Sequence, residues 1–339
     1  MSEKQVLCEF CQAVELEPQL LCDIPLRQWE LGPGVRLATS SCPLCEVIRR
    51  VYYENQRLRV IPKRLSLEQR VCLKWVYSDG IDTGGRPGFQ VGGEGADQRL
   101  EWIDGISICL QGFQGASNAV RQICCLKSDV SVNLDTHRIK EWIRLCVLEH
   151  KVTCSSEIDQ NPLVGHKFPG LKVLRLLDVE KLHIVEFRKD ERVPVYVALS
   201  YVWGSANTVR LTTANISELS TTAGFRASKF LLPRTIDDSI TLTQQLGLRF
   251  LWVDTLCLVQ NDFGDISLGV NVMDFIYEVS YLTIIAAEGY NAHSGLPGVQ
   301  SQSRLSQKNF EVKSGVFLGL ETRLDWLLER SVYRTRGWT

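Results

Sequence analysis

The stretch FLWVDTLCLVQ at residues 250–260 decides the fold. Its apolar and aromatic start runs straight into Asp254, which is typical of a strand buried on both faces of a sheet. The stretch YVALSYVWG at residues 196–204 has the same form, because its apolar run ends at Ser200. A helical pattern at residues 235–246 separates the two. They therefore predict neighbouring parallel strands that are joined by a crossover helix.

Short apolar runs alternate with helical patterns over the whole of residues 171–339. Such alternation predicts an α/β fold with a parallel-rich layered sheet and flanking helices, accompanied by a smaller Cys-rich N-terminal module. The expected strands are 171–177, 183–187, 195–200, 250–253 and 281–287. The expected helices are 235–246, which should end at Gly247, and 270–279.

The preceding sequence divides by composition. Residues 1–77 form the Cys-rich module with a helix at 43–57, and residues 78–100 are expected to be a Gly-rich loop, since seven glycines fall between positions 80 and 95. Residues 101–170 form a helical or mixed connecting region. In it, residues 136–150 predict a helix that packs one apolar face inward. Residues 171–339 form the α/β domain.

Composition excludes several classes of protein. With 339 residues, 38 Lys and Arg against 39 Asp and Glu leave a net charge of -1. That balance lacks the basic excess of a nucleic-acid-binding protein. No apolar run reaches the roughly 20 residues of a membrane span, and the N-terminus lacks the apolar core of a secretory signal. A cytoplasmic protein is therefore expected, with its 12 cysteines as thiols, ligands or core residues.

Four of these cysteines have metal-ligand spacing. Cys8 and Cys11 form one Cys-x-x-Cys pair, and Cys42 and Cys45 form a second one at the start of a helix. Two such pairs suit a tetrahedral structural zinc ion, which would not be catalytic because protein ligands would fill all four positions. The gap between the pairs is longer than usual in zinc fingers. Unmetallated core or surface thiols are the alternative.

A second group, Cys146, His150 and Cys154, follows helical spacing. These residues could join a metal site, or two of them could replace two of the N-terminal cysteines. Cys146 and His150 also lie on the apolar stripe of their helix, where a buried thiol and a hydrogen-bonded histidine are more common than metal ligands.

Polar and aromatic residues gather where the two decisive strands end. In parallel sheets, ligands bind outside the carboxyl ends of the strands. A ligand site there is expected to contain Ser200, Tyr201, Trp203, Gly204 and Asp254, with Gln260 and Glu288 at its edge. The alternative is structural: Asp254 would cap the next segment, and Tyr201 and Trp203 would pack. Common nucleotide-binding and hydrolase motifs do not occur in the sequence.

Several segments together resemble the fungal heterokaryon-incompatibility (HET) domain. They are YVALSYVWG at 196–204, LPRTIDDSITLTQQLGLRFLWVDTLCLVQND at 232–262, YLTIIAAEG and SGLPG between 281 and 298, and RGWT at 336–339. The upstream cysteine pairs and the helix with Cys146, His150 and Cys154 are similar to the N-terminal part of many such proteins. The resemblance thus extends over most of the chain.

The resemblance implies a cytosolic protein of fungal non-self recognition that triggers programmed cell death when a protein partner signals incompatibility. It also implies a fold distantly similar to Toll/interleukin-receptor domains, some of which hydrolyse NAD. In an NAD glycohydrolase, Asp254 would be the first catalytic carboxylate and Glu288 the second, and Tyr201 and Trp203 would stack on the rings of NAD. Fold-level analogy alone does not establish that chemistry.

Two departures from the family pattern affect the catalytic hypothesis. Family members commonly carry a Glu-containing turn after residues 260–262, whereas the only acid of this chain at 263–267 is Asp265. The RGWT block usually continues into further family residues, yet the sequence stops at Thr339, as a truncated chain would. A non-catalytic signalling or self-assembling module, which could form a homo-oligomer, is the alternative function. A small-molecule biosynthetic enzyme is a third.

Overall fold

The structure is a computed structural model. It describes residues 6–17, 21, 26–58, 70–76, 88–94, 99–103, 106–110, 133–149, 162–205, 208–227, 231–300, 309–322, 324–329 and 331–335. The chain forms two compact units. The N-terminal unit comprises Met1–Val130 and Leu305–Glu329, and the C-terminal unit comprises Ser131–Arg304 and Arg330–Thr339.

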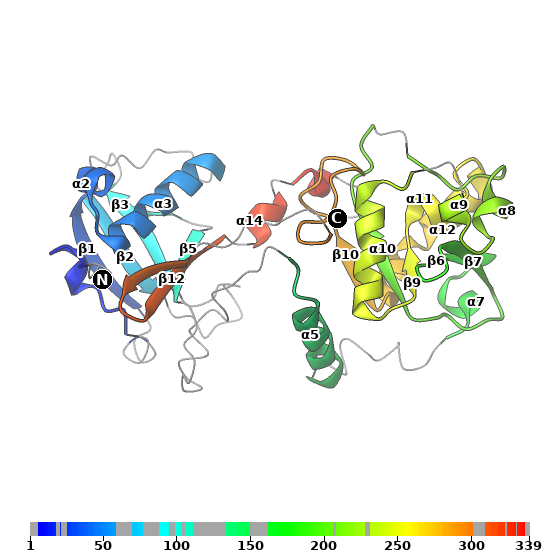
Figure 1. The fold of residues 1–339 in the computed structure, drawn as a ribbon, viewed down its shortest axis with the longest axis horizontal. Helices are drawn as coiled ribbons and strands as arrows, with labels where there is room; N and C mark the ends of the chain where they lie inside the picture. The colour runs from blue at the N-terminus through cyan, green and yellow to red at the C-terminus, as the bar shows by residue number, and fades with distance from the viewer. Residues whose placement is uncertain are drawn as a thin grey trace. The chain divides into compact units, whose positions relative to one another are not determined.

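The N-terminal unit is built on a seven-stranded sheet (Figure 1). The main path of the sheet is β1-β2-β3-β5-β12-β11, and β4 pairs with β3. The strands are β1 (Leu26–Pro33), β2 (Arg70–Val76), β3 (Gly88–Glu94), β4 (Leu100–Trp102), β5 (Ile106–Leu110), β11 (Asn309–Lys313) and β12 (Val316–Thr322). Every pairing among them is antiparallel. Residues 309–322 fall within the segment 171–339 that was expected to form a parallel-rich sheet, yet their strands β11 and β12 make only antiparallel pairs in the described part of this sheet.

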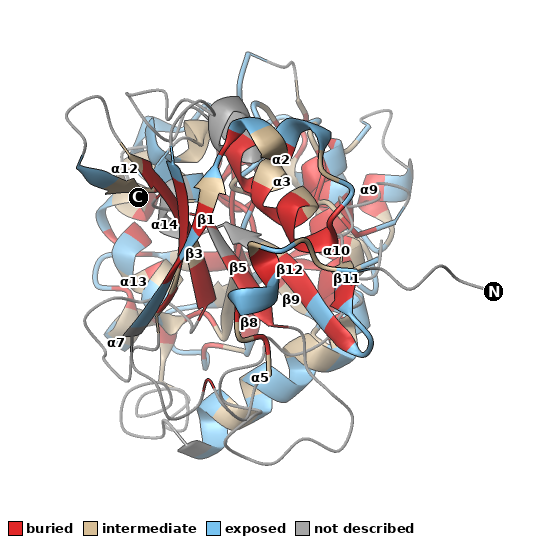
Figure 2. Cartoon of the chain, turned by 90° about the vertical axis from the view of Figure 1, so that its left-hand side faces the viewer, coloured by how far each residue is buried: buried red, intermediate tan, exposed pale blue. Residues whose placement is uncertain are grey.

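One helix covers the core of the N-terminal unit. Helix α3 (Pro43–Leu58) contacts β5, β11 and β12 and buries Leu44 and Ile48 there. In Figure 2 this side of the helix and the neighbouring strands are coloured as buried. Trp75 and Phe89 from adjacent strands meet edge to face with their ring centroids 4.9 Å apart, a favourable aromatic geometry. The unit also contains the short α2 (Val35–Thr39), a 3-10 turn at Cys11–Ala13, and α14 (Leu324–Glu329).

The expected Gly-rich loop at 78–100 is partly wrong, because its second half contains β3. Phe89 and Val91 of this strand are buried in the core of the N-terminal unit. A side chain at Gly92 would clash, since a Cβ there would lie 2.6 Å from the Trp102 ring and 2.8 Å from the Glu101 carbonyl oxygen. Some of these glycines thus serve close packing within a strand rather than mobility.

The expected C-terminal domain also loses a segment to the N-terminal unit. Strands β11 and β12 lie within the expected domain 171–339, yet β12 pairs with β5, with Leu318 opposite Leu110. Neither β11 nor β12 was among the strands expected from the local periodicity of the sequence. The local pattern contained no information about which distant strand a hairpin would join.

The C-terminal unit has a five-stranded mixed sheet with the order β10-β8-β9-β6-β7. The strands are β6 (Val173–Asp178), β7 (His183–Arg188), β8 (Tyr196–Ser200), β9 (Phe250–Trp252) and β10 (Leu282–Ile285). Strand β8 lies parallel to both β9 and β10. This confirms the prediction that the strand ending at Ser200 and the strand leading into Asp254 are parallel neighbours.

The sheet is nevertheless not parallel-rich, since β6 is antiparallel to both β7 and β9. A short turn, 179–182, connects β6 to β7. Parallel strands need a crossover connection of a dozen or more residues, so a turn of this length permits only an antiparallel hairpin.

Strand β8 is buried on both faces, which produces the expected layers. Val197 and Leu199 belong to a core cluster with Ile240 of α10 (Arg234–Leu246). Tyr196 and Ala198 belong to a second cluster that includes Met273 and Ile276 of α13 (Met273–Val279). Alternate residues of a strand point to opposite faces, so this sheet has a helix-bearing apolar layer on either side.

The helices of the C-terminal unit refine the predicted boundaries. Gly247 ends α10 with φ +80°, the left-handed conformation expected of a C-terminal glycine. The helix expected at 270–279 is instead two helices, α12 (Phe263–Asn271) and α13, separated at Val272. Asp262 accepts hydrogen bonds from Gly264 N and Asp265 N, which fixes the earlier start of α12. The remaining helices are α5 (Thr136–Glu149), α7 (Val164–Lys167), α8 (Ile216–Leu219), α9 (Gly224–Ala227), α11 (Asp254–Cys257) and a 3-10 turn at Val332–Thr335.

Helix α5 contacts α10 but buries little of its apolar stripe. Ile139 and Ile143 are half-buried, whereas Trp142 is 57% exposed and Cys146 is also exposed. The expectation that this whole stripe packs inward is therefore wrong for its outer residues, and Figure 2 shows the helix coloured mainly as exposed or intermediate. Among the described helices, none has the length and apolar character needed to cross a membrane.

Candidate functional site

The four predicted cysteine ligands converge in the N-terminal unit. The sulfur atoms of Cys8, Cys11, Cys42 and Cys45 all lie within 4.8 Å of one another. Cys45 Sγ lies 3.7 Å from Cys8 Sγ and 3.6 Å from Cys11 Sγ. All four are free thiols, and three of them are buried. The cluster can therefore hold a metal ion between two segments that are distant in sequence.

Local hydrogen bonds fix the backbone around each cysteine pair, and the four sulfur atoms converge. After Cys8 the chain makes a tight turn in which Cys11 N and Gln12 N donate to the Cys8 carbonyl oxygen at 2.9 and 3.0 Å. The second pair stands at the beginning of α3, where Cys42 N donates to Ser40 Oγ at 3.2 Å. Amide groups at a helix start favour negative charge nearby, which suits thiolate ligands.

The thiols cannot all ionise without a cation. Hydrogen bonds with Cys42 and Cys45, followed by burial, raise the pKa of the Cys11 thiol far above its ordinary value. Hydrogen bonds with Cys11 and Cys45 in turn lower the pKa of the Cys42 thiol. The crowded cluster thus favours the thiolate form at Cys42 and the protonated form at Cys11. A metal ion would supply the positive charge required for the remaining thiols to lose their protons.

Arg36 is a member of the cluster that the spacing of cysteines did not identify. Its Nη1 donates to Cys8 Sγ at 3.1 Å and to Cys45 Sγ at 3.5 Å. Its Nη2 donates to the Leu31 carbonyl oxygen, and the guanidinium lies 4.1 Å from the centroid of the Phe10 ring. Arg36 therefore delivers a fixed positive charge to two of the four sulfur atoms. A single arginine between two cysteine pairs gives no distinctive sequence signal.

The second group of ligand candidates is only partly within the described residues. Cys146 is exposed on α5 and is not among the four clustered cysteines. His150 and Cys154 lie outside the described residues. The proposal that they join or replace the N-terminal ligands stays untested.

At the carboxyl edge of the mixed sheet, the predicted residues of β8 and β9 come together. Ala198 pairs with Trp252, so Ser200 and Asp254 stand at equivalent positions two residues further along. Ser200 is 5% exposed, Tyr201 1% and Asp254 5%. Trp203 bends back toward β9, and its Nε1 donates to Asp254 Oδ1 at 3.1 Å and to Oδ2 at 3.0 Å.

Further hydrogen bonds fix this edge. Asp254 Oδ1 accepts from Thr255 N at 2.7 Å, and the hydroxyl groups of Tyr201 and Thr255 lie 2.9 Å apart. The Arg210 guanidinium lies over the Trp203 ring, 5.6 Å from its centroid. Sequence reasoning missed Thr255 and Arg210, because neither belongs to a recognisable motif. These contacts fix the orientation of the Trp203 ring and of the Asp254 carboxylate, and the carboxylate is buried.

The other predicted edge residues have different environments. Gly204 has φ +65°, and a Cβ there would lie 2.4 Å from Asn291 Cβ, so the turn needs glycine. Gln260 Nε2 donates at 3.0 Å to the carbonyl oxygens of Asp254 and Leu258, which closes the chain after α11. Glu288 is exposed, three residues beyond Ile285, which pairs with Ser200. Its catalytic role stays a prediction.

One comparison with known proteins covers this sheet edge. Residues 196–339 match the family model described as "Heterokaryon incompatibility protein (HET)". This segment is a HET domain. It contains every residue of the sheet edge that was predicted to bind or react with a ligand, whereas the four-cysteine cluster precedes it. No curated protein and no solved structure matches the chain.

Within the HET domain, Asp265 has a structural partner. Arg175 Nη1 donates to both carboxylate oxygens of Asp265 at 2.9 Å, and Asp265 Oδ2 accepts from Val259 N at 2.8 Å. The sole acid in the turn after residue 262 therefore joins β6 to α12. The RGWT block of the HET domain lies outside the described residues.

Proposed function

We propose that this chain is an effector of fungal non-self recognition whose HET domain triggers programmed cell death. The match of residues 196–339 to the HET family carries this proposal. Expression of the chain in a fungal cell should cause growth arrest or death that depends on the HET domain. Continued growth with the full-length protein present, both alone and with its incompatible partner strain, would contradict the proposal.

NAD hydrolysis is the chemistry that the sheet edge supports best. Water would add to the ribose carbon as the bond to nicotinamide breaks, giving nicotinamide, ADP-ribose and a proton. A carboxylate can stabilise the positive charge that develops on the ribose in such a transition state. Asp254 would have this role, and Glu288 would be the second carboxylate. Tyr201 and Trp203 would lie against the rings of NAD. The rim of the ligand site would be formed by Ser200, Gly204 and Gln260. The resemblance of ALSYVWG at residues 198–204 to the first strand of Toll/interleukin-receptor domains supports the choice of NAD as substrate.

A non-catalytic signalling module is the second candidate, and one observation favours it. Asp254 is 5% exposed, and its oxygens already accept from Trp203 and Thr255. Such a carboxylate can serve as a structural acid that holds the turn after β8. In that case the surface of the domain, not its chemistry, would recruit the partner protein or a second copy of the chain.

Nicotinamide release by the full chain distinguishes the two candidates. Asp254→Asn keeps the size of the side chain and removes its charge, and Asp190→Asn is the matched control because Asp190 is exposed on the same unit. If NAD is the substrate, the wild type and the control release nicotinamide and Asp254→Asn does not, although it remains folded. Activity that survives in folded Asp254→Asn would transfer the role to Glu288, to be tested with Glu288→Gln. Absence of release by the wild type would favour the non-catalytic module.

We also propose that the four-cysteine cluster binds zinc as a structural ion. Sulfur atoms bound tetrahedrally at about 2.3 Å from one zinc ion lie about 3.8 Å from one another. The sulfur separations of 3.6 and 3.7 Å around Cys45 agree with this geometry. Elemental analysis of the purified protein should find one zinc ion per chain, and Cys45→Ser should lose it. A wild-type protein purified without chelator that holds no zinc would contradict the proposal.

A further inference from the structure

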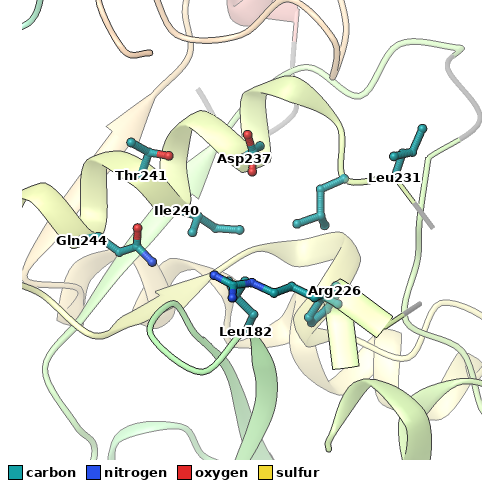
Figure 3. A pocket seen from close by; sticks show the side chains of 9 residues that line it. Leu182, Arg226, Leu231, Asp237, Ile240, Thr241 and Gln244 are labelled. Atoms are coloured by element: carbon teal, nitrogen blue, oxygen red, sulfur yellow. The ribbon is translucent and has the colours of Figure 1, made fainter. Parts of the chain in front are cut away.

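A cavity of about 500 Å³ beside α10 has walls of mixed character. Figure 3 shows Asp237, Thr241 and Gln244 on α10 and the Arg226 side chain on the facing wall. Ile240 also lines the cavity but is only 4% exposed. Charges of both signs and little accessible apolar surface favour no single class of ligand there. The four-cysteine cluster offers a more specific chemistry.

One cysteine of the four-cysteine cluster is more accessible than the others. Cys8 is half-buried, whereas Cys11, Cys42 and Cys45 are buried. A cysteine that binds a metal ion does so as the thiolate. The susceptibility of a cysteine to oxidation follows its thiolate character and its exposure. An oxidant that approaches the occupied metal site therefore meets the sulfur of Cys8 first.

The geometry of the cluster offers Cys45 as the partner of Cys8. Their sulfur atoms lie 3.7 Å apart. Arg36 Nη1 donates to both of them, at 3.1 Å to Cys8 Sγ and at 3.5 Å to Cys45 Sγ, so that one nitrogen atom holds the two sulfur atoms together. A disulfide bond requires a sulfur separation of about 2.05 Å. The two sulfur atoms can therefore join through small shifts of their side chains.

We infer that Cys8 is an oxidation site at which hydrogen peroxide converts the metal site into a Cys8–Cys45 disulfide. This inference rests on the proposed structural zinc ion. In the first step the Cys8 thiolate attacks one peroxide oxygen, the O–O bond breaks, hydroxide leaves, and Cys8 becomes a sulfenic acid. In the second step the Cys45 thiolate attacks the Cys8 sulfur, the S–S bond forms, the S–O bond breaks, and a second hydroxide leaves. Two electrons pass from the two thiolates to the peroxide.

Formation of this disulfide expels the metal ion but keeps the chain connected. The ion would retain only Cys11 and Cys42 as sulfur ligands, which is half of a closed tetrahedral set. The disulfide would replace the ion as the link between the segment around Cys8 and the start of α3. Oxidation thus differs from chelation, which removes the ion and the link together.

Peptide mapping of the full chain tests the inference. The protein is treated with hydrogen peroxide, its free thiols are alkylated under denaturing conditions, and trypsin separates the two cysteine pairs into residues 5–27 and 37–49. We expect these peptides to become cross-linked through Cys8 and Cys45, as fragmentation spectra identify. One zinc ion should be released per cross-link, measured with a chromophoric chelator. Dithiothreitol with added zinc should reverse both changes.

Cys146 provides the matched controls, because it is an exposed cysteine outside the cluster. Its sulfenic acid in the wild type, trapped with dimedone, measures how much oxidant an exposed thiol has met. Cys146→Ser should form the cross-link and release zinc as the wild type does. Cys8→Ser lacks the accessible sulfur, and it should form any cross-link between the two peptides at least tenfold more slowly.

Two results would overturn the inference. One is a wild-type protein that keeps its zinc and its cluster thiols under conditions that oxidise Cys146. The other is a disulfide that lacks Cys8 or joins it to a cysteine other than Cys45. Zinc analysis before treatment tests the zinc proposal by itself. If the protein holds no zinc, that proposal fails, while the cross-link still decides the oxidation site.

Discussion

The indole N–H of Trp203 is shared between the two carboxylate oxygens of Asp254, at 3.1 and 3.0 Å. These residues are 51 positions apart in sequence, and they join the ends of two parallel strands. A buried carboxylate with such a donor stabilises the fold whether or not it also reacts, because loss of either partner leaves the other without its hydrogen bond.

A double-mutant cycle on this pair should show coupling. Trp203→Phe removes the N–H and keeps an aromatic ring, and Asp254→Asn removes the charge. We expect a coupling free energy of about 1–2 kcal/mol from urea unfolding of the four proteins. Purely additive effects would mean that the hydrogen bond contributes nothing to stability.

Arg36→Gln should weaken metal binding without preventing it. The substitution removes the positive charge beside Cys8 and Cys45 but none of the four sulfur ligands. Loss of an outer-shell partner typically reduces metal affinity about 10–100-fold. Competition with a chromophoric chelator measures the change. Arg50→Gln is the control, since Arg50 forms a solvent-exposed pair with Glu46, and its metal affinity should equal that of the wild type.

Chelation of the metal should loosen the N-terminal unit selectively. The four cysteines connect the segment around Cys8 to the start of α3, and α3 covers the antiparallel sheet. Removal of the ion breaks that connection. Helix α3 contacts β5 and β12, so hydrogen exchange at the amides of these strands should accelerate, while β8 and β9 keep their protection. Equal acceleration in both units would show that the ion does not act locally.

Asp178 should make the C-terminal unit sensitive to acid. Burial alone would raise its pKa, but hydrogen bonds from Lys181 N and from the Arg249 guanidinium outweigh burial and lower the pKa. A lowered pKa in the folded state stabilises the fold above the unfolded-state value of about 3.9, and this contribution disappears as the pH falls through the folded-state pKa.

The variant Asp178→Asn should lose about 2 kcal/mol of unfolding free energy at pH 7. It should also show a weaker loss of stability than the wild type as the pH falls below about 4. Urea unfolding over a pH series measures both effects. Asp190→Asn provides the exposed control, and parallel pH curves for wild type and Asp178→Asn would contradict the assignment.

Gly204→Ala should destabilise the HET domain more than Gly247→Ala. Both glycines have positive φ, but an added Cβ at Gly204 would meet Asn291, whereas nothing lies within 4 Å at Gly247. Backbone strain is common to both variants, so their difference measures the clash. We expect Gly204→Ala to lose about 1–3 kcal/mol more. Thermal unfolding of the two variants decides the matter, and equal melting temperatures would show that Asn291 moves aside freely.

The sequence alone predicted features that depend on local pattern. Apolar runs that end at Ser200 and Asp254 identified two neighbouring parallel strands, and the two cysteine pairs identified the cluster. Spacing and periodicity express such features directly. Features that depend on distant partners were missed. The pairing of β12 with β5 and the position of Arg36 over the thiols follow from tertiary packing, for which no local signal exists.

Glycine content misled the prediction for a related reason. A cluster of glycines usually indicates a loop. In β3, however, Gly92 is required because the Trp102 ring occupies the place of its side chain. The sequence does not distinguish a glycine that makes the backbone flexible from one that makes room for a neighbouring side chain. Only the packing of the folded sheet shows which is the case.

Because β5 pairs with β12, the N-terminal sheet cannot be completed until β12 has been synthesised. Strand β5 ends at Leu110 and β12 begins at Val316. At about 5–20 residues per second, the roughly 200 intervening residues take on the order of 10–40 s to synthesise. Throughout that interval β5 lacks its neighbour β12. An unpaired strand edge can aggregate with other chains or bind chaperones. The mixed sheet, whose last strand ends at Ile285, can be complete before the sheet that precedes it in the sequence.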